Sequence, residues 1–345
     1  MTRPVRRLGA LHPLTPGGHW AAYLILVLIF VAVFWLNPSF AEPASLMAFV
    51  KKAAPLVVLA VGQYFVIVNG EFDLSVGSLV GAQVVIAAKM LNGEESRTWP
   101  VLAFMIVFGL LIGLVNGLVT TVLRVPSFIT TIGMMFVLYG AIRLWTGGAP
   151  TGALSVAFRQ VGRGGFASPV GQFQIPWALV VVVVVAVLAV SLMRRPFGRT
   201  LVATGDNPRA AEFSGVHHAW VTTRAFLLSG FLATVAAVLI GGYAGVTAQV
   251  GAGLEFTAIT AVVLGGVVLG GGRGTVPAAI AGALTLEALF TLFNQLSVPS
   301  TLRPTVQGAI IIAAVAFAAL PRRHRSRPVS GAVAPEGREP LPAAG

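Results

Sequence analysis

The sequence predicts an all-α integral membrane protein, a polytopic bundle of about ten transmembrane helices. Two observations lead to this fold class. The 345-residue chain is 56% hydrophobic and only 10% charged, with a mean hydropathy of +0.88, which a soluble chain of this size does not show. Long apolar runs without the alternating pattern of barrel strands also lie between charged or Pro- and Gly-rich breaks.

The apolar runs define the spans in order, because a helix needs roughly 20 mostly apolar residues to cross about 30 Å of hydrocarbon. We expect spans at residues 20–36, 53–69, 74–91, 99–123, 126–145, 174–193, 224–246, 256–270, 276–294 and 302–320. Residues 20–321 therefore form the transmembrane domain. No small-residue cleavage site follows the first run, so it is predicted to stay as an uncleaved helix.

Two tails flank this domain. Residues 1–19 are predicted to be a cytoplasmic N-terminal tail. Residues 322–345 are rich in Pro, Gly and Ala with little to bury, so they are predicted to be a disordered cytoplasmic tail.

The distribution of basic residues predicts that both termini are cytoplasmic, since short basic loops stay on that side. The larger set then lies inside: Arg3, Arg6, Arg7, Arg124, Arg194, Arg195, Arg199, Arg209, Arg224, Arg273, Arg322, Arg323, Arg325, Arg327 and Arg338. A smaller set lies outside: Lys51, Lys52, Lys89, Arg97, Arg143, Arg159, Arg163 and Arg303. The Lys51–Lys52 pair is the main exception to this topology. The net charge of +12 is explained by topology and anionic lipid, not by nucleic acid.

Two loops are long enough to matter. The loop at 147–173, predicted to be external, is rich in Gly with scattered Arg and Ser. It is either a contact for an external partner or a flexible crossover, and its lack of hydrophobic periodicity supports both interpretations equally. The loop at 194–223 is predicted to be cytoplasmic, and it is polar with several Gly and Pro residues that break up local structure.

Residues 207–215 within that loop predict a short helix. Asn207 can cap its first turn, Pro208 fits the first helical position, and Gly215 can take the left-handed stop conformation. Because a helix of two turns does not hold alone in water, we expect it to pack on something, and another subunit is one candidate.

Glycines recur at four-residue spacing within the spans, and we assign them to close helix packing. They are Gly77 and Gly81, then Gly109, Gly113 and Gly117, then Gly241 and Gly245. A weak similarity between residues 70–82 and 271–283, each a Gly-rich break followed by a small-residue helix, suggests a two-fold pseudo-repeat.

The segment 68–78 carries two carboxylates, Glu71 and Asp73, between two apolar runs with almost no loop to solvate them. Acids at membrane depth are costly, so they usually line a pathway or pair with something. One interpretation is a broken helix that lines a solute route, with Ser75 and Ser78 beside the acids. The other is structural: Asp73 or Ser75 caps the following helix and Glu71 sits at the headgroup level.

A second Gly-rich break separates the runs at 256–270 and 276–294. It is predicted to be a hinge or tight turn, with Arg273 facing the cytoplasm; the residues assigned to it are Gly265, Gly266, Gly272, Arg273 and Gly274. It is not a phosphate loop, because no Lys-Ser or Lys-Thr follows at the required spacing. ATP-driven work would therefore need a separate subunit.

Catalytic and metal chemistry find no support in the sequence. The chain has no cysteine, and its histidines, His12, His19, His217, His218 and His324, lie outside the expected spans. Neither an H-E-x-x-H nor a G-x-S-x-G arrangement occurs. We expect a chain that is not an enzyme and holds no cofactor or metal.

Three blocks of the sequence resemble the ribose-type sugar permeases of bacterial ABC importers, within the branched-chain amino acid and sugar permease superfamily. Residues 70–78 (GEFDLSVGS) resemble the family's G-G-I-D-L-S-V-G-S signature, departing at its second and third positions. Residues 197–215 resemble its G-R…A-x-G-x-N-x-x-A-A-x-x-S-G segment. Residues 258–266 and 271–275 resemble its A-I-A-A-V-V-L-G-G and G-G-R-G-S blocks. The likeness covers nearly the whole chain except the two tails.

This resemblance implies a permease subunit of the bacterial inner membrane that moves a small sugar or similar polar solute by alternating access. It implies a second permease copy or paralogue, a cytoplasmic ATPase that binds the ATP, and an external solute-binding protein. The loop helix would be the coupling element in a groove of the ATPase, through Gly205, Asn207, Ala210, Ala211 and Gly215. Glu71 replaces the family's usual glycine, and we hold it as a modulator of solute choice.

Two alternatives remain at this stage. An ion-coupled secondary carrier would use Glu71 and Asp73 for proton or sodium coupling. A passive channel would need neither energy source.

Overall fold

The computed structural model describes residues 19–169, 171–247 and 249–319, so the two predicted tails lie outside the described residues apart from His19. The N-terminal half consists of α1 (His19–Leu36), the short 3-10 turn η1 (Pro38–Ala41), α2 (Pro43–Val68), α3 (Val76–Leu91), η2 (Glu95–Arg97), α4 (Thr98–Thr121), α5 (Ser127–Thr146) and α6 (Val156–Arg163). A small hairpin follows, in which β1 (Gly165–Ala167) pairs antiparallel with β2 (Gln174–Pro176).

The C-terminal half is again helical. It consists of α7 (Trp177–Arg194), α8 (Pro196–Asp206), α9 (Pro208–Phe213), α10 (His218–Ala244), α11 (Leu254–Leu264), α12 (Val276–Gln295), η3 (Ser300–Leu302) and α13 (Arg303–Ala319).

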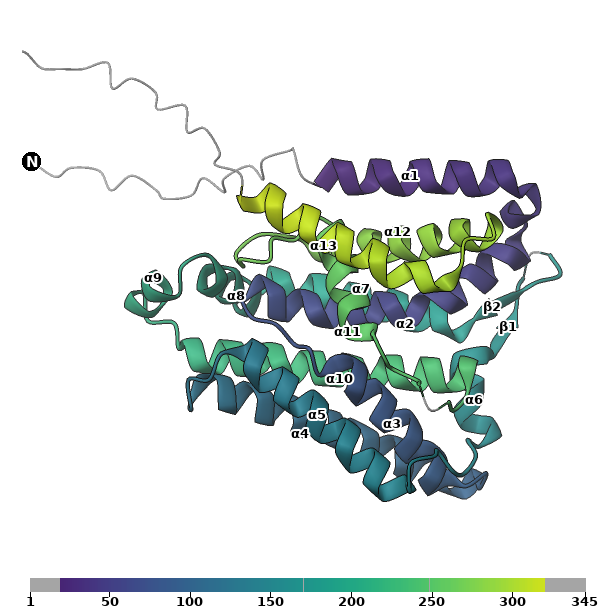
Figure 1. The fold of residues 1–345 in the computed structure, drawn as a ribbon, viewed down its shortest axis with the longest axis horizontal. Coiled ribbons are helices and arrows are strands. Elements are labelled where there is room, and N and C mark those ends of the chain that lie inside the picture. The colour runs from purple at the N-terminus through teal and green to yellow at the C-terminus, as the bar shows by residue number, and fades with distance from the viewer. Residues whose placement is uncertain (1–18, 170, 248, 320–345) are drawn as a thin grey trace, which may run out of the picture.

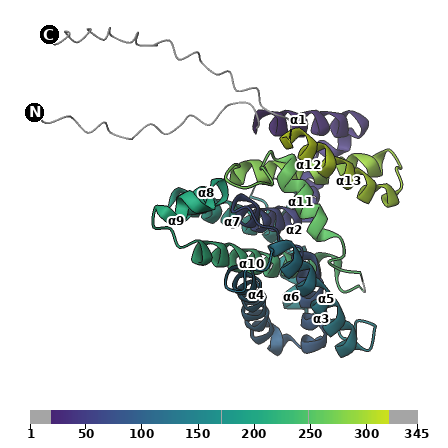
Figure 2. The ribbon, with the colours of Figure 1, turned by 60° about the vertical axis from the view of Figure 1, so that its left-hand side comes forward.

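The helices form three groups that run roughly side by side (Figures 1 and 2). Helices α1, α12 and α13 lie on one side, α3, α4 and α5 on the other, and α2, α7 and α10 between them. The core follows α2, which is buried without a break from Ala53 to Asn69. Helices α8 and α9 project at one end of the bundle, whereas α6 and the hairpin lie at the opposite end (Figure 1). We call these the α9 end and the hairpin end.

Each expected span overlaps one helix, and the all-α fold class is confirmed. Among the described residues, six helices are long and apolar enough to cross a membrane, and shorter apolar helices accompany them at Ala22–Leu36, Val76–Leu91 and Leu254–Leu264. Many of their apolar side chains point outward, for example Leu28, Val107 and Leu188, as expected of surfaces that face lipid. Helix α1 begins and α13 ends toward the α9 end of the bundle (Figure 1).

Helix α2 begins at Pro43 rather than at residue 53, so the expected boundary was wrong. The sequence suggested a break at Lys51 and Lys52, but both side chains have partners. The Lys52 ammonium lies 2.7 Å from Oε1 of Glu287 on α12, and Lys51 donates to the carbonyl of Arg163 at 2.8 Å. Because their charges are held by distant residues, the helix continues through the pair.

The loop at 147–173 is not the flexible crossover that was one of its two interpretations. It contains α6, whose Phe158 is fully buried, and Gly162 packs so closely on α10 that a Cβ there would lie 2.4 Å from the Leu239 carbonyl oxygen. The Glu95 carboxylate accepts hydrogen bonds from the first amides of α6, at Val156 and Ala157. These tertiary contacts, not hydrophobic periodicity, order the segment.

Other boundaries also differ from expectation, since α10 begins at His218 rather than at residue 224 and so shortens the predicted loop at 194–223. Helix α11 ends at Leu264 instead of residue 270, because the Gly-rich turn begins earlier. The loop at 194–223 contains a second helix, α8, which the polar sequence did not predict; its buried face includes Leu201 and Thr204.

The glycine repeats pack as predicted at most positions. Gly109, Gly113 and Gly117 of α4 all face α10, and a Cβ on Gly113 would lie 2.4 Å from the Phe226 carbonyl oxygen. Gly245 is the exception, since it ends α10 and a Cβ there would meet nothing within 4 Å.

Candidate functional site

The short helix α9 forms as its sequence predicts. Asn207 is its N-cap, and its side-chain oxygen accepts a hydrogen bond of 3.0 Å from the Ala210 amide. Pro208 occupies the first turn, where its missing N–H costs nothing. Gly215 has a φ of +84°, a conformation that other residues adopt at a cost. The helix is therefore specified locally at both ends.

One apolar side chain of α9 is almost fully exposed. Phe213 is 93% exposed, the most exposed of the large hydrophobic residues, and Arg209, Ala210 and Glu212 beside it are exposed too. Ala211 is buried and turns toward the body of the protein. A Phe held outward at the end of a capped helix is typical of an aromatic anchor for a protein partner.

The helix α8 joins α9 to the bundle through a tight contact of three chain segments. Gly205 lies so close to the end of α2 that a Cβ on it would stand 1.9 Å from the Val68 carbonyl oxygen and 2.6 Å from the Gly272 amide nitrogen. That amide donates to the same Val68 carbonyl at 2.8 Å, and Gly70 and Gly271 complete the contact. We call Gly70, Gly205, Gly271 and Gly272 the glycine junction.

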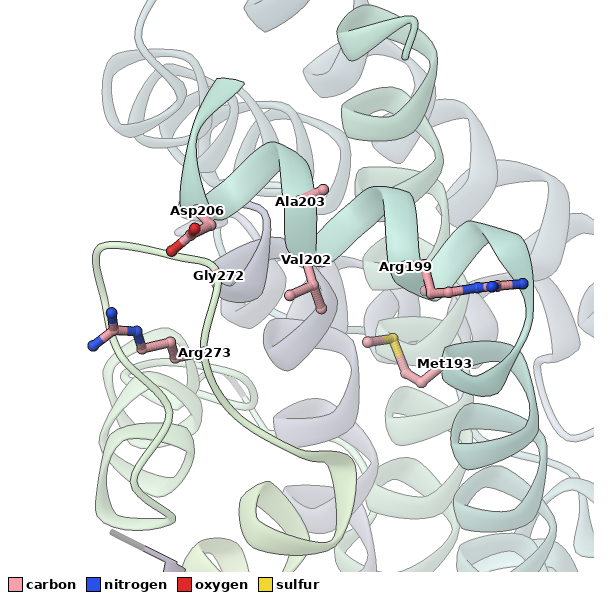
Figure 3. Close-up of a pocket in the computed structure, with 8 residues that line it drawn as sticks. Met193, Arg199, Val202, Ala203, Asp206, Gly272 and Arg273 are labelled. Carbon is pink, nitrogen blue, oxygen red and sulfur yellow. The ribbon is translucent and has the colours of Figure 1, made fainter. Parts of the chain in front are cut away.

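A hollow of about 600 Å³ opens beside the glycine junction (Figure 3). Helix α8 forms one wall, and the turn carrying Gly272 and Arg273 forms another. Its lining comprises Met193, Gly198, Arg199, Val202, Ala203, Asp206, Gly272 and Arg273. This end of the bundle thus offers a projecting apolar anchor and, next to it, a recess lined by both apolar and charged side chains.

The Gly-rich segment between α11 and α12 is a closed turn. The Val268 amide donates to the Arg273 carbonyl across it at 3.1 Å, and Thr275 caps α12 through the Ala278 amide. Gly266 and Gly274 have positive φ values there. Gly265 instead packs against α12, where a Cβ would lie 2.2 Å from the Ala278 carbonyl oxygen. The geometry is that of a tight turn, which was one of the two expected forms.

Asp73 lies at the centre of a buried hydrogen-bond network. Its Oδ1 accepts from the amide (3.0 Å) and the hydroxyl (2.6 Å) of Ser75, and its Oδ2 accepts from the Ser229 hydroxyl at 2.7 Å. Asn116 donates to the Ser75 hydroxyl at 2.9 Å, and the Ser78 hydroxyl donates to the Ser75 carbonyl at 2.8 Å. Asp73 therefore accepts from the amide of Ser75, the N-cap residue of α3, whereas no side chain caps the first turn of that helix, so the expected cap is not confirmed.

Glu71 does not join this network. Its side chain is partly exposed, and it follows Gly70 of the glycine junction at the α9 end. The two carboxylates that are neighbours in sequence thus lie in different surroundings. The chain places Asp73 inside and Glu71 at the surface.

All three sequence blocks contribute a residue to the glycine junction, the first block through Gly70 at its start. Residues 70, 205 and 271–272 are far apart in sequence, yet they share one contact. The sequence analysis missed Phe213 and Asp206. An exposed aromatic residue in a polar helix was a signal that could have identified Phe213, whereas the contact of Asp206 with Gly272 depends on the fold.

Residues 45–315 match the family described as "Branched-chain amino acid transport system / permease component". The chain belongs to this family of transport permeases, and it is a multi-pass protein of the bacterial inner membrane. The resemblance to ABC importer permeases of the sugar type is thereby confirmed.

Two relatives are similar along most of their length. The chain is 31% identical to the autoinducer 2 import system permease protein LsrC of Escherichia coli (strain K12 / DH10B), over 86% of this chain and 85% of the relative. It is 32% identical to the LsrC protein of Salmonella typhi, over 86% of this chain and 84% of that relative. No solved structure gives a significant match.

Proposed function

We propose that this chain is the translocating permease subunit of an ABC importer for a small sugar or similarly polar solute, and that it works by alternating access. The energy comes from ATP bound and hydrolysed by a separate cytoplasmic subunit, and the chain itself holds no cofactor. A second permease copy or paralogue and an external solute-binding protein complete the assembly. About ten spans with both termini cytoplasmic place α9 on the side of the ATPase.

The observation that carries this proposal is the way α9 is built. Its caps define both of its ends, Phe213 points away from the chain, and α8 ties it to the end of α2 and to the turn between α11 and α12 through the glycine junction. Because Gly205 and Gly272 leave no space for a side chain between these segments, a displacement of α9 moves the end of α2 and this turn with it. A coupling element has to transmit its displacement to the transmembrane helices in this way.

The named relatives support import as the direction of transport, since both are components of an autoinducer 2 import system. The solute of this chain is open within the polar class, so D-ribose, D-galactose and autoinducer 2 are the compounds to compare. Glu71, partly exposed at the α9 end, remains our candidate for an effect on solute choice.

The ion-coupled carrier is the alternative. It would require Asp73 to exchange a proton or sodium ion, but its two oxygens already accept three hydrogen bonds in a buried site. Each exchange would break this network, which favours a structural role for Asp73.

The proposal is tested by affinity purification of the tagged chain from its native membrane, followed by mass spectrometry and an ATPase assay. We expect an ABC ATPase to co-purify and to be lost when residues 208–213 are replaced by a Gly-Ser linker of equal length. If the chain purifies alone and moves solute in liposomes without ATP, the importer proposal is wrong.

A further inference from the structure

We infer that the polar solute is held on its way through the protein in a pocket between α3, α5 and the segment that leads into α11, and that its class is a small neutral polyhydroxylated compound. This inference rests on the proposed transport function and locates the solute within it. It also moves the solute site away from Asp73.

The pocket has a volume of about 310 Å³, within the range of small-molecule sites. Helix α3 lines it with Ser78 and Gly81, helix α5 with Tyr139 and Arg143, and the segment before α11 with Gln249. Apolar side chains complete the walls: Ala82, Val85, Phe136, Leu138, Ile142, Val250 and Ala252. A mostly apolar lining with a few converging polar groups is typical of a ligand site.

The described residues of the segment before α11, 245–247 and 249–253, are non-helical, and part of the segment reaches α3. Helix α10 ends at Ala244, toward the hairpin end, and α11 begins at Leu254. Between them Gly251 lies against the first two turns of α3, where a Cβ on it would stand 2.3 Å from the Gly77 carbonyl oxygen and 2.6 Å from the Gly81 amide. Those turns lie next to the Asp73 network, far from the hairpin end of α3.

Helix α11 is correspondingly short. Its 11 residues span roughly 16 Å at 1.5 Å per residue, about half of the hydrocarbon thickness. Non-helical backbone at membrane depth is tolerated where protein buries it or where it lines a water-filled cavity. Broken or short helices that meet near the middle of the membrane are also the usual walls of a transporter's solute site.

An uncompensated carboxylate oxygen lies against α3 beside Gly77, the residue that precedes Ser78 of the pocket lining. Glu255, in the first turn of α11, is 5% exposed, and its Oε2 has no hydrogen-bond partner among the described residues. This oxygen is packed on α3, since a Cβ on Gly77 would lie 1.9 Å from it. Tyr139 is within electrostatic reach of both Glu255 and Arg143. A buried acceptor without a partner at this depth is costly unless it serves a passing polar group.

The polar groups fit a neutral solute with several hydroxyls. Arg143 and Gln249 donate, the Tyr139 hydroxyl both donates and accepts, and the Gln249 oxygen accepts. The Ser78 hydroxyl can only accept, because its hydrogen is donated to the Ser75 carbonyl. The apolar walls suit the C–H faces of a sugar. Of the residues that line this pocket, Arg143 alone carries a formal charge, and the other polar groups suit the hydroxyls of a neutral solute.

The chain has no native cysteine, so single cysteines can report on this pocket in the assembled importer. We would compare Tyr139→Cys and Gln249→Cys with Val137→Cys, an outward-facing control on α5 that is 61% exposed. The reagent is a membrane-impermeant anionic methanethiosulfonate, applied from outside to proteoliposomes. We expect both pocket cysteines to react at least about tenfold faster than the control, because a thiol needs water to ionise.

The second measurement is ATP-driven uptake of labelled D-ribose, D-galactose and autoinducer 2 before and after modification. We expect the reagent to stop uptake through Tyr139→Cys or Gln249→Cys and to leave uptake through Val137→Cys unchanged. The inference is wrong if the pocket cysteines react no faster than the control, or if uptake stays complete after both pocket cysteines have been modified. If the unmodified importer takes up none of these solutes with ATP, the proposed function fails, while the labelling rates still decide whether the pocket is open to polar molecules.

Discussion

Gly205 determines how closely α8 approaches the end of α2, because its missing side chain is what lets three segments touch. We expect Gly205→Ala to destabilise the protein by about 1–3 kcal/mol, the usual effect of overpacking, and to lower ATP-driven uptake further by loosening the glycine junction. Thermal unfolding in detergent and an uptake assay measure the two effects. Gly133→Ala on α5 is the control, since a Cβ there meets nothing within 4 Å; equal behaviour of the two variants would contradict the role of the junction.

Phe213 gives a second prediction at the scale of a single residue. Burying a Phe side chain contributes about 1.5–3 kcal/mol, so Phe213→Ala is expected to weaken binding of the ATPase subunit roughly 10- to 150-fold without lowering the stability of the isolated chain. Binding of the purified subunits by surface plasmon resonance tests this. Phe166→Ala, an exposed Phe of β1 at the opposite end, should leave the affinity unchanged.

Asp73 is expected to act through the order of α3. Asp73→Ala leaves the Ser75 amide and the Ser75 and Ser229 hydroxyls without their acceptor, which costs about 2–5 kcal/mol. Uptake should fall with the amount of folded protein. Wild-type uptake at normal membrane expression would show that neither the network nor a pathway role of Asp73 matters. Ser214→Ala, at the exposed C-cap of α9, serves as a control for stability.

At the scale of elements, the ion pair between Lys52 and Glu287 joins α2 to α12. Glu287 is largely buried and Lys52 is about one-third exposed, so solvent screens the pair in part. We expect either single change, Lys52→Met or Glu287→Leu, to cost roughly 1–3 kcal/mol, and the double change to cost less than their sum. Additive effects in a double-mutant cycle would mean that the pair does not couple the two helices.

The helices also differ in whether local sequence signals or tertiary contacts stabilise them. Helix α9 carries its own signals in Asn207, Pro208 and Gly215, and it was therefore predictable from adjacent residues. Helix α6 and the hairpin depend on contacts with Glu95 and α10, which the sequence of the loop does not contain. The same holds for α8, whose buried side faces the end of α2, more than a hundred residues away, and the turn at Gly272.

At the scale of the whole molecule, the proposed orientation makes a prediction about sidedness. Gln172→Cys in the hairpin loop should react with an impermeant thiol reagent in intact spheroplasts, and Glu212→Cys on α9 only after permeabilisation. Both residues are exposed and lie at opposite ends of the bundle. The reverse pattern would place α9 outside and remove the basis for its contact with a cytoplasmic ATPase.

The sequence by itself determined the properties that depend on composition and on neighbouring residues. Apolar length predicted the helices that face lipid, cap residues predicted α9, and three short blocks indicated the permease family. Glycine spacing predicted that Gly109, Gly113 and Gly117 lie at a close helix contact, because such contacts need small residues, but it did not identify α10 as the partner.

Only the tertiary structure decided where the two acidic residues go and what lies beside them. Glu71 and Asp73 are two positions apart, yet Glu71 lies at the surface and Asp73 is buried. The Asp73 carboxylate accepts three hydrogen bonds, two from Ser75 and one from Ser229 on α10. The glycine junction, the pair of Lys52 with Glu287 and the pocket beside Tyr139 also join residues from distant parts of the chain. Such contacts have no local signal, because they depend on which helices the packed bundle brings together.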